Sequence, residues 1–184
     1  MRRISDDHWL ERCRRVPTPH CDHRPDAEAI DLIVIHGISL PPGQFGSGAV
    51  EALFAGMLDC DSDPAFRSLE GVRVSAHLFI NRQGSVVQFV PFHRRAWHAG
   101  VSMWRGRKNC NAWSIGIELE GTDDLPYTKR QYKTLVAVLK ALMVRYPRLS
   151  RDTIVGHAEV APGRKTDPGP WFDWVGLLTQ LKLC

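Results

Sequence analysis

The sequence lacks the features that would direct a protein to a membrane or to an oxidising compartment. It has no run of 18 apolar residues, and its first residues, MRRISDDHWLERCRRV, have no apolar core of a secretory signal. Its 5 cysteines form no C-x-x-C pair, and their odd number favours free thiols in a reducing compartment. We therefore expect a cytoplasmic protein without membrane contacts.

Charge of one sign is not concentrated along the chain. The 24 Lys and Arg against 20 Asp and Glu give a net charge of +4, and the arginines are spread out rather than gathered in one stripe. A nucleic-acid partner is therefore not expected, whereas an anionic small molecule suits a mildly basic surface. The sequence indicates no obligate protein partner.

The spacing of apolar residues, Gly and Pro predicts strands and helices in one α/β domain over residues 1–184. Strands are expected at 31–37, in a hairpin at 74–91 that turns at 81–84, at 113–121 and at 153–157. Helices are expected at 49–58, 128–146 and 171–181, and loops at 39–48, 59–71 and 92–111. Residues 1–30 read as an irregular N-terminal arm. The fold class we expect is a central mixed β-sheet flanked by α-helices.

Two of these elements carry detailed local signals. Thr128 and Gln131 are spaced as a capping box at the start of helix 128–146. In strand 113–121, Ile115, Ile117 and Leu119 alternate with Glu118 and Glu120, so the two carboxylates share one strand face. Alternation alone leaves open whether that face lines a catalytic site or is solvated, and Glu120 is the better candidate for solvent.

The stretch GHAEVAPGRKTDPGP (156–170) contains three Gly and three Pro, so it is expected to be a shaped loop rather than an ordinary helix. It carries His157 and Asp167, and His36 ends the strand at 31–37. Two histidines and one carboxylate form a known catalytic zinc set that leaves one position for water. The sequence spacing is weak evidence by itself, because histidines without a metal are common.

Other polar residues could complete such a site. Glu118 could take a proton from a zinc-bound water, and the Lys165 ammonium could stabilise an oxyanion. Lys165 could equally be a solvated loop residue. His77 and His98 are possible competing ligands, although His77 could also be a buried histidine bonded to its neighbours.

Six segments of the chain then form a recognisable set: VIHGISLPPGQFG, RVSAHLFI, RAWHAGVS, SIGIELEGTD, YTKRQY and GHAEVAPGRKTDPGP. Together they resemble the cytosolic 1,6-anhydro-N-acetylmuramoyl-L-alanine amidases of the AmpD type. That family belongs with the peptidoglycan recognition proteins to a group sharing the zinc amidase fold, a central mixed sheet flanked by helices. The resemblance runs from about Arg15 to Trp174.

The resemblance implies one Zn²⁺ per chain, held by His36, His157 and Asp167, with Glu118 and Lys165 as the catalytic pair. It implies hydrolysis of the amide between the lactyl group of the anhydro sugar and L-alanine, in small muropeptides released during cell-wall recycling. Segments that border the family's substrate groove contain Arg73, Trp97, His98 and Arg164.

The chain departs from the family at Gly37, where an Asn often follows the first zinc histidine. An Asn side chain could bond the substrate, so another group or water would have to replace that contact. Two alternative functions stay open: a lytic amidase acting on intact peptidoglycan, and a muropeptide-binding sensor with little turnover. The sequence also leaves open whether Glu118 or Lys165 protonates the leaving amine.

Overall fold

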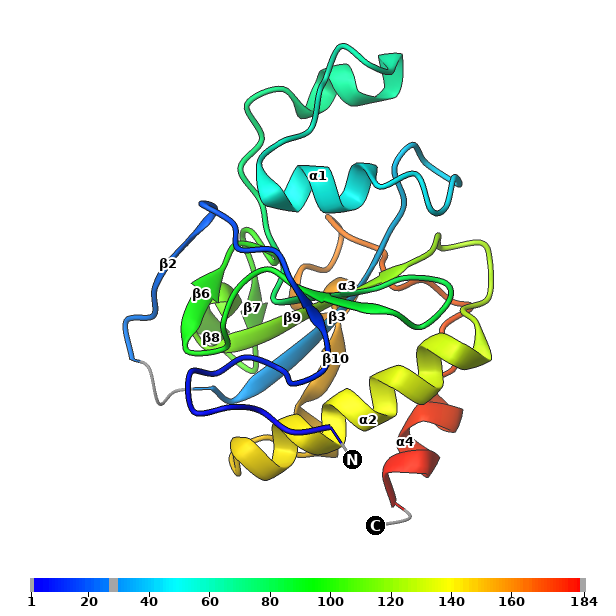
Figure 1. Cartoon of the computed structure of the whole chain (residues 1–184). Helices are drawn as coiled ribbons and strands as arrows, with labels where there is room; N and C mark the ends of the chain where they lie inside the picture. Colours follow the sequence, from blue (N-terminus) through cyan, green and yellow to red (C-terminus); the bar gives the residue numbers. More distant parts are fainter. Residues whose placement is uncertain (1, 27–29, 183–184) are drawn as a thin grey trace.

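A mixed six-stranded sheet forms the centre of the computed structural model, which describes residues 2–26 and 30–182 (Figure 1). Its strand order is β1-β5-β4-β9-β3-β10. The strands are β1 (Arg14–Arg15), β3 (Leu32–Ile38), β4 (Leu78–Ile80), β5 (Val86–Gln88), β9 (Ser114–Glu120) and β10 (Ile154–Gly156). Strands β4, β9, β3 and β10 are parallel neighbours, and β5 is antiparallel to β4. The predicted mixed sheet is confirmed.

The remaining elements surround this sheet. Two small ribbons pair β2 (Cys21–His23) with β6 (Arg94–Ala96), and β7 (Met103–Trp104) with β8 (Arg107–Lys108). The α-helices are α1 (Ala49–Ala55), α2 (Lys129–Arg145), α3 (His157–Val160) and α4 (Trp174–Lys182). Short 3₁₀ helices are η1 (Pro64–Leu69), η2 (Cys110–Ala112) and η3 (Arg151–Thr153).

The structure corrects several segments that were predicted to be irregular. The N-terminal arm contains β1 and β2, the loop at 59–71 contains η1, and the loop at 92–111 contains β6, β7, β8 and the start of η2. Residues 157–160 form one helical turn inside the predicted Gly- and Pro-rich loop. Strands of two or three residues form because they pair with segments distant in sequence. Local sequence patterns therefore do not reveal them.

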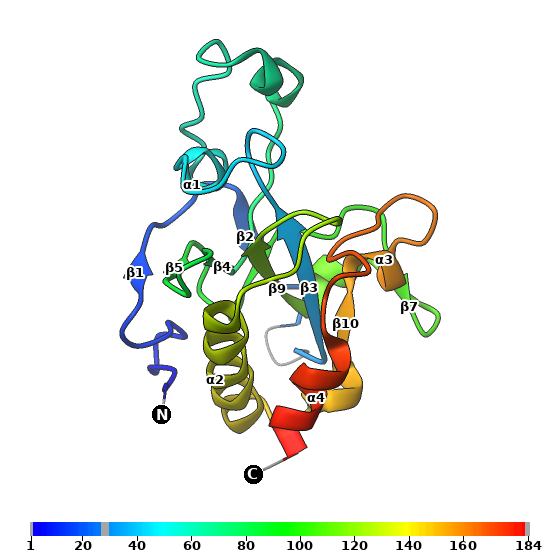
Figure 2. The same ribbon diagram turned by 90° about the vertical axis from the view of Figure 1, so that its right-hand side faces the viewer.

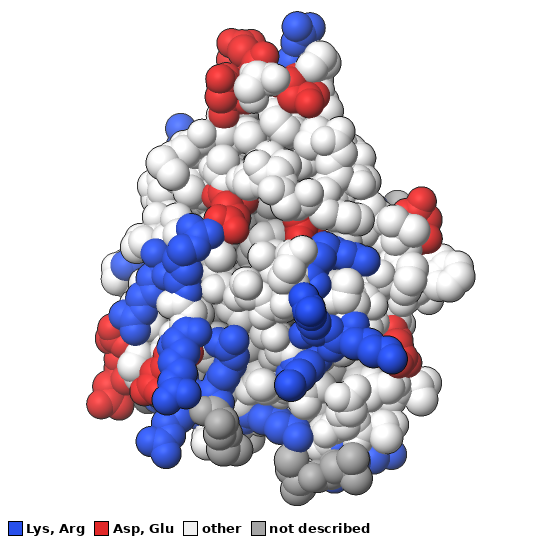
Figure 3. Space-filling view, turned by 45° about the vertical axis from the view of Figure 1, so that its right-hand side comes forward, with Lys and Arg blue, Asp and Glu red and all other residues white. Residues whose placement is uncertain are grey.

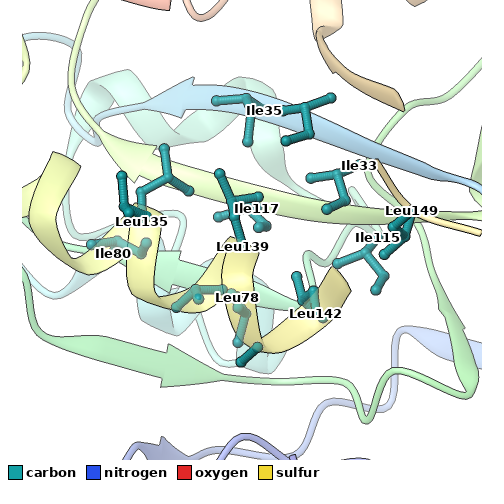
Figure 4. Packing of buried hydrophobic residues seen from close by; sticks show 14 of the residues in the cluster. Ile33, Ile35, Leu78, Ile80, Ile115, Ile117, Leu135, Leu139, Leu142 and Leu149 are labelled. Carbon is teal, nitrogen blue, oxygen red and sulfur yellow. The ribbon is translucent and has the colours of Figure 1, made fainter. Parts of the chain in front are cut away.

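Helix α2 covers one face of the sheet, and α4 lies beside it on the same face (Figure 2). Ile33 and Ile35 of β3 and Ile115 and Ile117 of β9 point at α2 (Figure 4). They pack against its Leu135, Leu139 and Leu142. The Thr128 hydroxyl accepts from the Gln131 N–H at 3.1 Å, and the Gln131 side chain accepts from the Thr128 N–H at 3.0 Å. The predicted capping box is therefore confirmed.

The opposite face of β3 and β9 carries the polar side chains. Leu32 and Val34 pack there against Trp113 and Val160, and His36 and Glu118 follow in the same alternation. Glu120 is only 4% exposed, because its carboxylate accepts from the backbone N–H groups of Gly46 and Arg82. The expectation of a solvated Glu120 was wrong, since a short loop and the turn after β4 close over it.

The surface is mildly basic without a single basic stripe. Figure 3 shows most Lys and Arg of one face in separate groups over its middle and lower part, and acidic and basic side chains together at the upper tip. Among the described helices, none has the length and apolar character needed to cross a membrane.

Candidate metal and active site

Three donor atoms from separate segments converge at the carboxyl ends of the parallel strands. His36 lies near the end of β3, His157 directly follows β10, and Asp167 comes from the loop beyond α3. The two histidine Nδ1 atoms are 3.0 Å apart, and Asp167 Oδ2 lies 3.2 Å from His36 Nδ1 and 3.1 Å from His157 Nδ1. Among the described residues, these three form the group of His, Cys, Asp or Glu suited to a metal ion.

The hydrogen bonds of His157 show which of its nitrogens is available. Its Nε2 lies 3.2 Å from the carbonyl oxygen of Ala99, which can only accept, so Nε2 carries the proton. In the neutral imidazole, Nδ1 then carries no proton and has a free lone pair. This lone pair faces His36 Nδ1 and Asp167 Oδ2. Zinc–ligand bonds of about 2.0 Å in a tetrahedron place ligand atoms about 3.3 Å apart, so this cluster fits Zn²⁺.

His98 lies behind the metal-facing side of His36. His98 Nδ1 is 2.9 Å from His36 Nε2, and His98 Nε2 is 3.1 Å from the Ser114 hydroxyl. A side chain at Gly116 would collide with the His98 ring, since its Cβ would lie 2.4 Å from Cγ of that ring. The glycine in β9 thus leaves room for an imidazole that contacts a candidate ligand, a position distinct from the metal cluster itself.

Glu118 lies opposite His36 in the register of β3 and β9. The residue is 7% exposed, and its Oε1 lies 3.9 Å from His36 Nδ1. Its Oε2 is buried without a hydrogen-bond partner in the described structure. Burial and the charge of Asp167 raise the pKa of Glu118 well above its usual value, which Lys165 partly opposes. A buried carboxylate with one free oxygen suits a general base.

The pKa values of the candidate ligands favour the protonation states that bind a cation. Burial lowers the pKa of His36 to about 4, assisted by the charges of His157 and Lys165, so the ring is neutral near pH 7. Burial would raise the pKa of Asp167, but hydrogen bonds with His157 and His36 outweigh it and lower that pKa. Lys165 is exposed, and its charge reaches both His36 and Glu118.

The residues assigned to the substrate groove lie in different surroundings. Arg73 is exposed and lines a cavity of about 190 Å³ with Leu53, Leu58 and Leu69. Trp97 stacks on His20 with ring centroids 6.2 Å apart. These contacts place Arg73 and Trp97 beside α1 and the N-terminal arm, outside the cluster formed by His36, His157, Asp167 and Glu118.

The Arg164 side chain forms hydrogen bonds with the backbone near the metal cluster. Its Nη2 donates to the carbonyl oxygens of Ala99 at 2.6 Å and Val101 at 2.8 Å. The same residue lines a cavity of about 670 Å³ that Lys108 also lines. Arg164 therefore contacts both this cavity and the Ala99 carbonyl oxygen beside the candidate metal site.

His77 and Gly37 resolve two questions left by the sequence. His77 is buried, accepts from the Gly116 N–H through Nδ1 at 3.0 Å, and places Nε2 3.1 Å from the Arg94 carbonyl oxygen. It is a core histidine. At Gly37, a Cβ would lie 2.2 Å from the Tyr127 hydroxyl, so that hydroxyl occupies the space a side chain would need.

Sequence reasoning missed three residues that organise this site: Arg24, Asn111 and Tyr127. Arg24 is buried and donates to the carbonyl oxygens of Phe92, Asn111 and Ser114. The Tyr127 hydroxyl donates to the carbonyl oxygen of Pro168 at 3.0 Å. A single Arg in a polar arm and a single Asn in a loop carry no periodic signal. Tyr127 lies within YTKRQY, where it was read only as part of the resemblance.

A mixed sheet that presents two histidines, an aspartate and a buried glutamate at one edge defines a site of the metallohydrolase type. The family model for N-acetylmuramoyl-L-alanine amidase matches residues 26–170. The chain belongs to the N-acetylmuramoyl-L-alanine amidase family and is an amidase.

Relatives of known name support this assignment over nearly the whole chain. The 1,6-anhydro-N-acetylmuramyl-L-alanine amidase AmpD of Citrobacter freundii is 56% identical over 171 residues, which cover 93% of this chain and 91% of that protein. A crystal structure of a selenomethionine AmpD derivative matches with a TM-score of 0.93 and 53% identity, over 97% of this chain and 99% of the other.

A more distant solved structure contains a ligand. It is the amidase AmiD from Escherichia coli in complex with the substrate anhydro-N-acetylmuramic acid-L-Ala-D-γ-Glu-L-Lys. It matches with a TM-score of 0.61 and 28% identity, over 96% of this chain and 65% of that chain. The resemblance and fold expected from the sequence are thus confirmed.

Proposed function

We propose that this amidase is a zinc enzyme that cleaves the bond between the lactyl group of 1,6-anhydro-N-acetylmuramic acid and L-alanine in free muropeptides. The observation that carries the zinc assignment is the convergence of His36 Nδ1, His157 Nδ1 and Asp167 Oδ2 within 3.0 to 3.2 Å. Electron-donating atoms repel one another at that separation unless a cation or proton lies among them. Zinc bound to such a set supplies an acidified water and polarises a carbonyl group.

Glu118 is the general base in this proposal. Its carboxylate accepts a proton from the attacking water while the water oxygen bonds to the lactyl carbonyl carbon. As the carbon–nitrogen bond breaks, the same carboxyl group returns the proton to the amine of L-alanine. Its raised pKa supports this second role, because a buried carboxyl group holds a proton long enough to transfer it. The products are the lactyl carboxylate and a free stem peptide.

Lys165 stabilises the negative charge that develops on the carbonyl oxygen. Its exposed ammonium is near enough to lower the pKa values of His36 and Glu118. A cation near a developing oxyanion stabilises it through its charge alone. This proposal separates the two catalytic roles: Glu118 moves the proton, and Lys165 supplies charge.

The names of the relatives support the substrate class. The 56% identical protein is named for the 1,6-anhydro sugar, and the Escherichia coli complex holds an anhydro-muramyl peptide. Muropeptide stems carry free carboxylates, and the cavity of about 670 Å³ lined by Arg164 and Lys108 offers cations to them. We place Arg73, Trp97 and His98 in the same proposal as residues bordering the substrate, with His98 acting through His36.

The thiols support a reducing compartment, and we propose the cytoplasm. In the described part of the chain, Cys13, Cys21, Cys60 and Cys110 are all free. Cys184, also predicted to be free, lies outside the described residues. Small recycled muropeptides would meet the enzyme in that compartment.

Mass spectrometry of products from anhydro-muropeptide, with and without a chelator, tests this function. We expect an anhydro sugar and an intact stem peptide, loss of both after chelation, and recovery with one equivalent of Zn²⁺. Full activity in the metal-free protein would refute the zinc assignment. Greater activity on intact sacculus than on anhydro-muropeptide would favour the lytic alternative, and binding of muropeptide without product would favour a sensor.

A further inference from the structure

His98 and Ala99 contact the Nε2 atoms of the two candidate histidine ligands, which are the ring nitrogens that point away from the metal cluster. The His98 imidazole lies 2.9 Å from His36 Nε2, and the Ala99 carbonyl oxygen lies 3.2 Å from His157 Nε2. If His36 binds metal through Nδ1, its Nε2–H donates to His98 Nδ1, and the His98 Nε2–H donates to the Ser114 hydroxyl. The placement of residues 98 and 99 therefore determines how both rings face the metal.

One side chain fixes the backbone of these two residues. The Asn111 carboxamide oxygen accepts from the His98 N–H at 3.1 Å and from the Ala99 N–H at 2.7 Å. The carbonyl oxygen of Asn111 in turn accepts from the buried Arg24 guanidinium at 3.2 Å. Asn111 contacts neither the metal cluster nor Glu118 in any hydrogen bond or ion pair of the described residues.

We propose that Asn111 is a positioning residue for the metal site, which holds the 98–99 segment so that His36 and His157 both present Nδ1 to the metal. The inference rests on the proposed zinc site. It adds a residue that touches neither metal nor substrate and that acts on two ligands at once. The Ala99 carbonyl is fixed from the other side by Arg164, so the segment is held at three points.

The physical cost of losing this contact falls on the ligands. Without the Asn111 oxygen, two backbone N–H groups lose their partner, and the 98–99 segment relaxes to find water or another acceptor. The His36 and His157 rings then lose the fixed partners that select the metal-binding tautomer. Loss of such outer contacts costs about 10- to 100-fold in metal affinity in other metal sites.

The variants Asn111→Leu and Asn111→Asp test the proposal. Leu has a similar size and no acceptor, whereas Asp keeps an oxygen at the same place. We expect Asn111→Leu to weaken zinc binding about 10- to 100-fold, measured by competition with a chromophoric chelator, and Asn111→Asp to stay near wild type. The visible spectrum of the Co²⁺-substituted protein should change in Asn111→Leu only.

Asn81 provides a matched control. Its side-chain oxygen also accepts from two backbone N–H groups, those of Gln83 at 3.1 Å and Ser85 at 2.9 Å, in the turn after β4. Asn81→Leu should lower thermal stability without changing zinc affinity or the Co²⁺ spectrum. Equal losses of zinc affinity in Asn81→Leu and Asn111→Leu would overturn the proposal, because the effect would then follow from general destabilisation.

A second pair of variants covers the case in which Asn111→Leu does not fold. His98→Gln retains an acceptor for the His36 Nε2–H, and His98→Leu does not, so only His98→Leu should weaken zinc binding. Imidazole ¹⁵N spectra of the metal-free wild type should show His157 protonated on Nε2. If Asn111→Leu does not fold, wild-type zinc affinity in His98→Leu refutes the positioning role alone, because the 98–99 segment then does not act on His36. A wild type that binds no zinc refutes the proposed function as well.

Discussion

Glu118 lies directly opposite His36 on adjacent parallel strands, and the two side chains occupy the same sheet face. Parallel pairing is what places a candidate base beside a candidate ligand, because both strands end at the same edge of the sheet. The first prediction concerns this pair. Glu118→Ala should retain zinc, since Glu118 is outside the three-residue cluster, while turnover falls by about 10²- to 10⁴-fold.

Metal analysis and steady-state kinetics on anhydro-muropeptide check the Glu118→Ala prediction. Glu120→Gln is the matched control, because it removes the charge of the next carboxylate on the same face and keeps one of the two oxygens that accept from the Gly46 and Arg82 N–H groups. Glu120→Gln should retain activity. Hydrolysis by Glu118→Ala at the wild-type rate would remove Glu118 from the mechanism.

The ionisation of Glu118 should also affect the stability of the metal-free protein. Burial raises its pKa in the folded state, so the folded state binds this proton more tightly than the unfolded chain does. The resulting stabilisation is complete below the unfolded-state pKa of about 4.3 and is lost as the pH rises through the folded-state pKa. Glu118→Gln cannot ionise, so its stability relative to wild type should increase with pH.

Thermal unfolding of both metal-free proteins between about pH 5 and pH 8 measures this difference. A difference in melting temperature that stays constant over that interval would show that Glu118 ionises normally in the folded protein.

Gly37 and Tyr127 should show energetic coupling. A Cβ at position 37 would lie 2.2 Å from the Tyr127 hydroxyl but 3.5 Å from Cζ of the same ring. Gly37→Ala should therefore cost about 1–3 kcal/mol in the free energy of unfolding. Tyr127→Phe removes the hydroxyl and its bond to Pro168, at a cost of about 0.5–1.5 kcal/mol.

The double variant should be more stable than the sum of the two single losses, because the Tyr127→Phe substitution leaves room for the new methyl group. Denaturant unfolding of all four proteins in a double-mutant cycle gives the coupling energy. Additive losses would mean that the Gly37→Ala loss does not arise from the contact with the Tyr127 hydroxyl.

Arg164 should affect substrate affinity more than the chemical step if it contacts stem-peptide carboxylates. Arg164→Glu reverses its charge, so the Michaelis constant for peptide-bearing substrates should rise by about 10- to 100-fold. A substrate whose stem carboxylates are amidated serves as the control and should show a smaller change. Equal effects on both substrates would indicate that Arg164 acts only as an anchor for Ala99 and Val101.

The sequence determined the longer local elements and the chemical character of this protein. Alternation in residues 113–121 predicted the strand face of Glu118, and the capping box predicted the start of α2. The Gly- and Pro-rich stretch at 156–170 predicted a shaped path between His157 and Asp167. These features depend on near neighbours in the chain, which a single sequence displays directly.

Only the tertiary structure decided which atoms meet. His36 and His157 are separated by 121 residues, and the sheet order brings their Nδ1 atoms to 3.0 Å. Asn111 and His98 acquire their importance from hydrogen bonds formed when the 92–111 segment folds over the sheet face opposite α2. The exclusion of a side chain at position 37 likewise depends on where α2 and its preceding turn place Tyr127. Such contacts follow from packing between distant segments, for which the chain carries no local pattern.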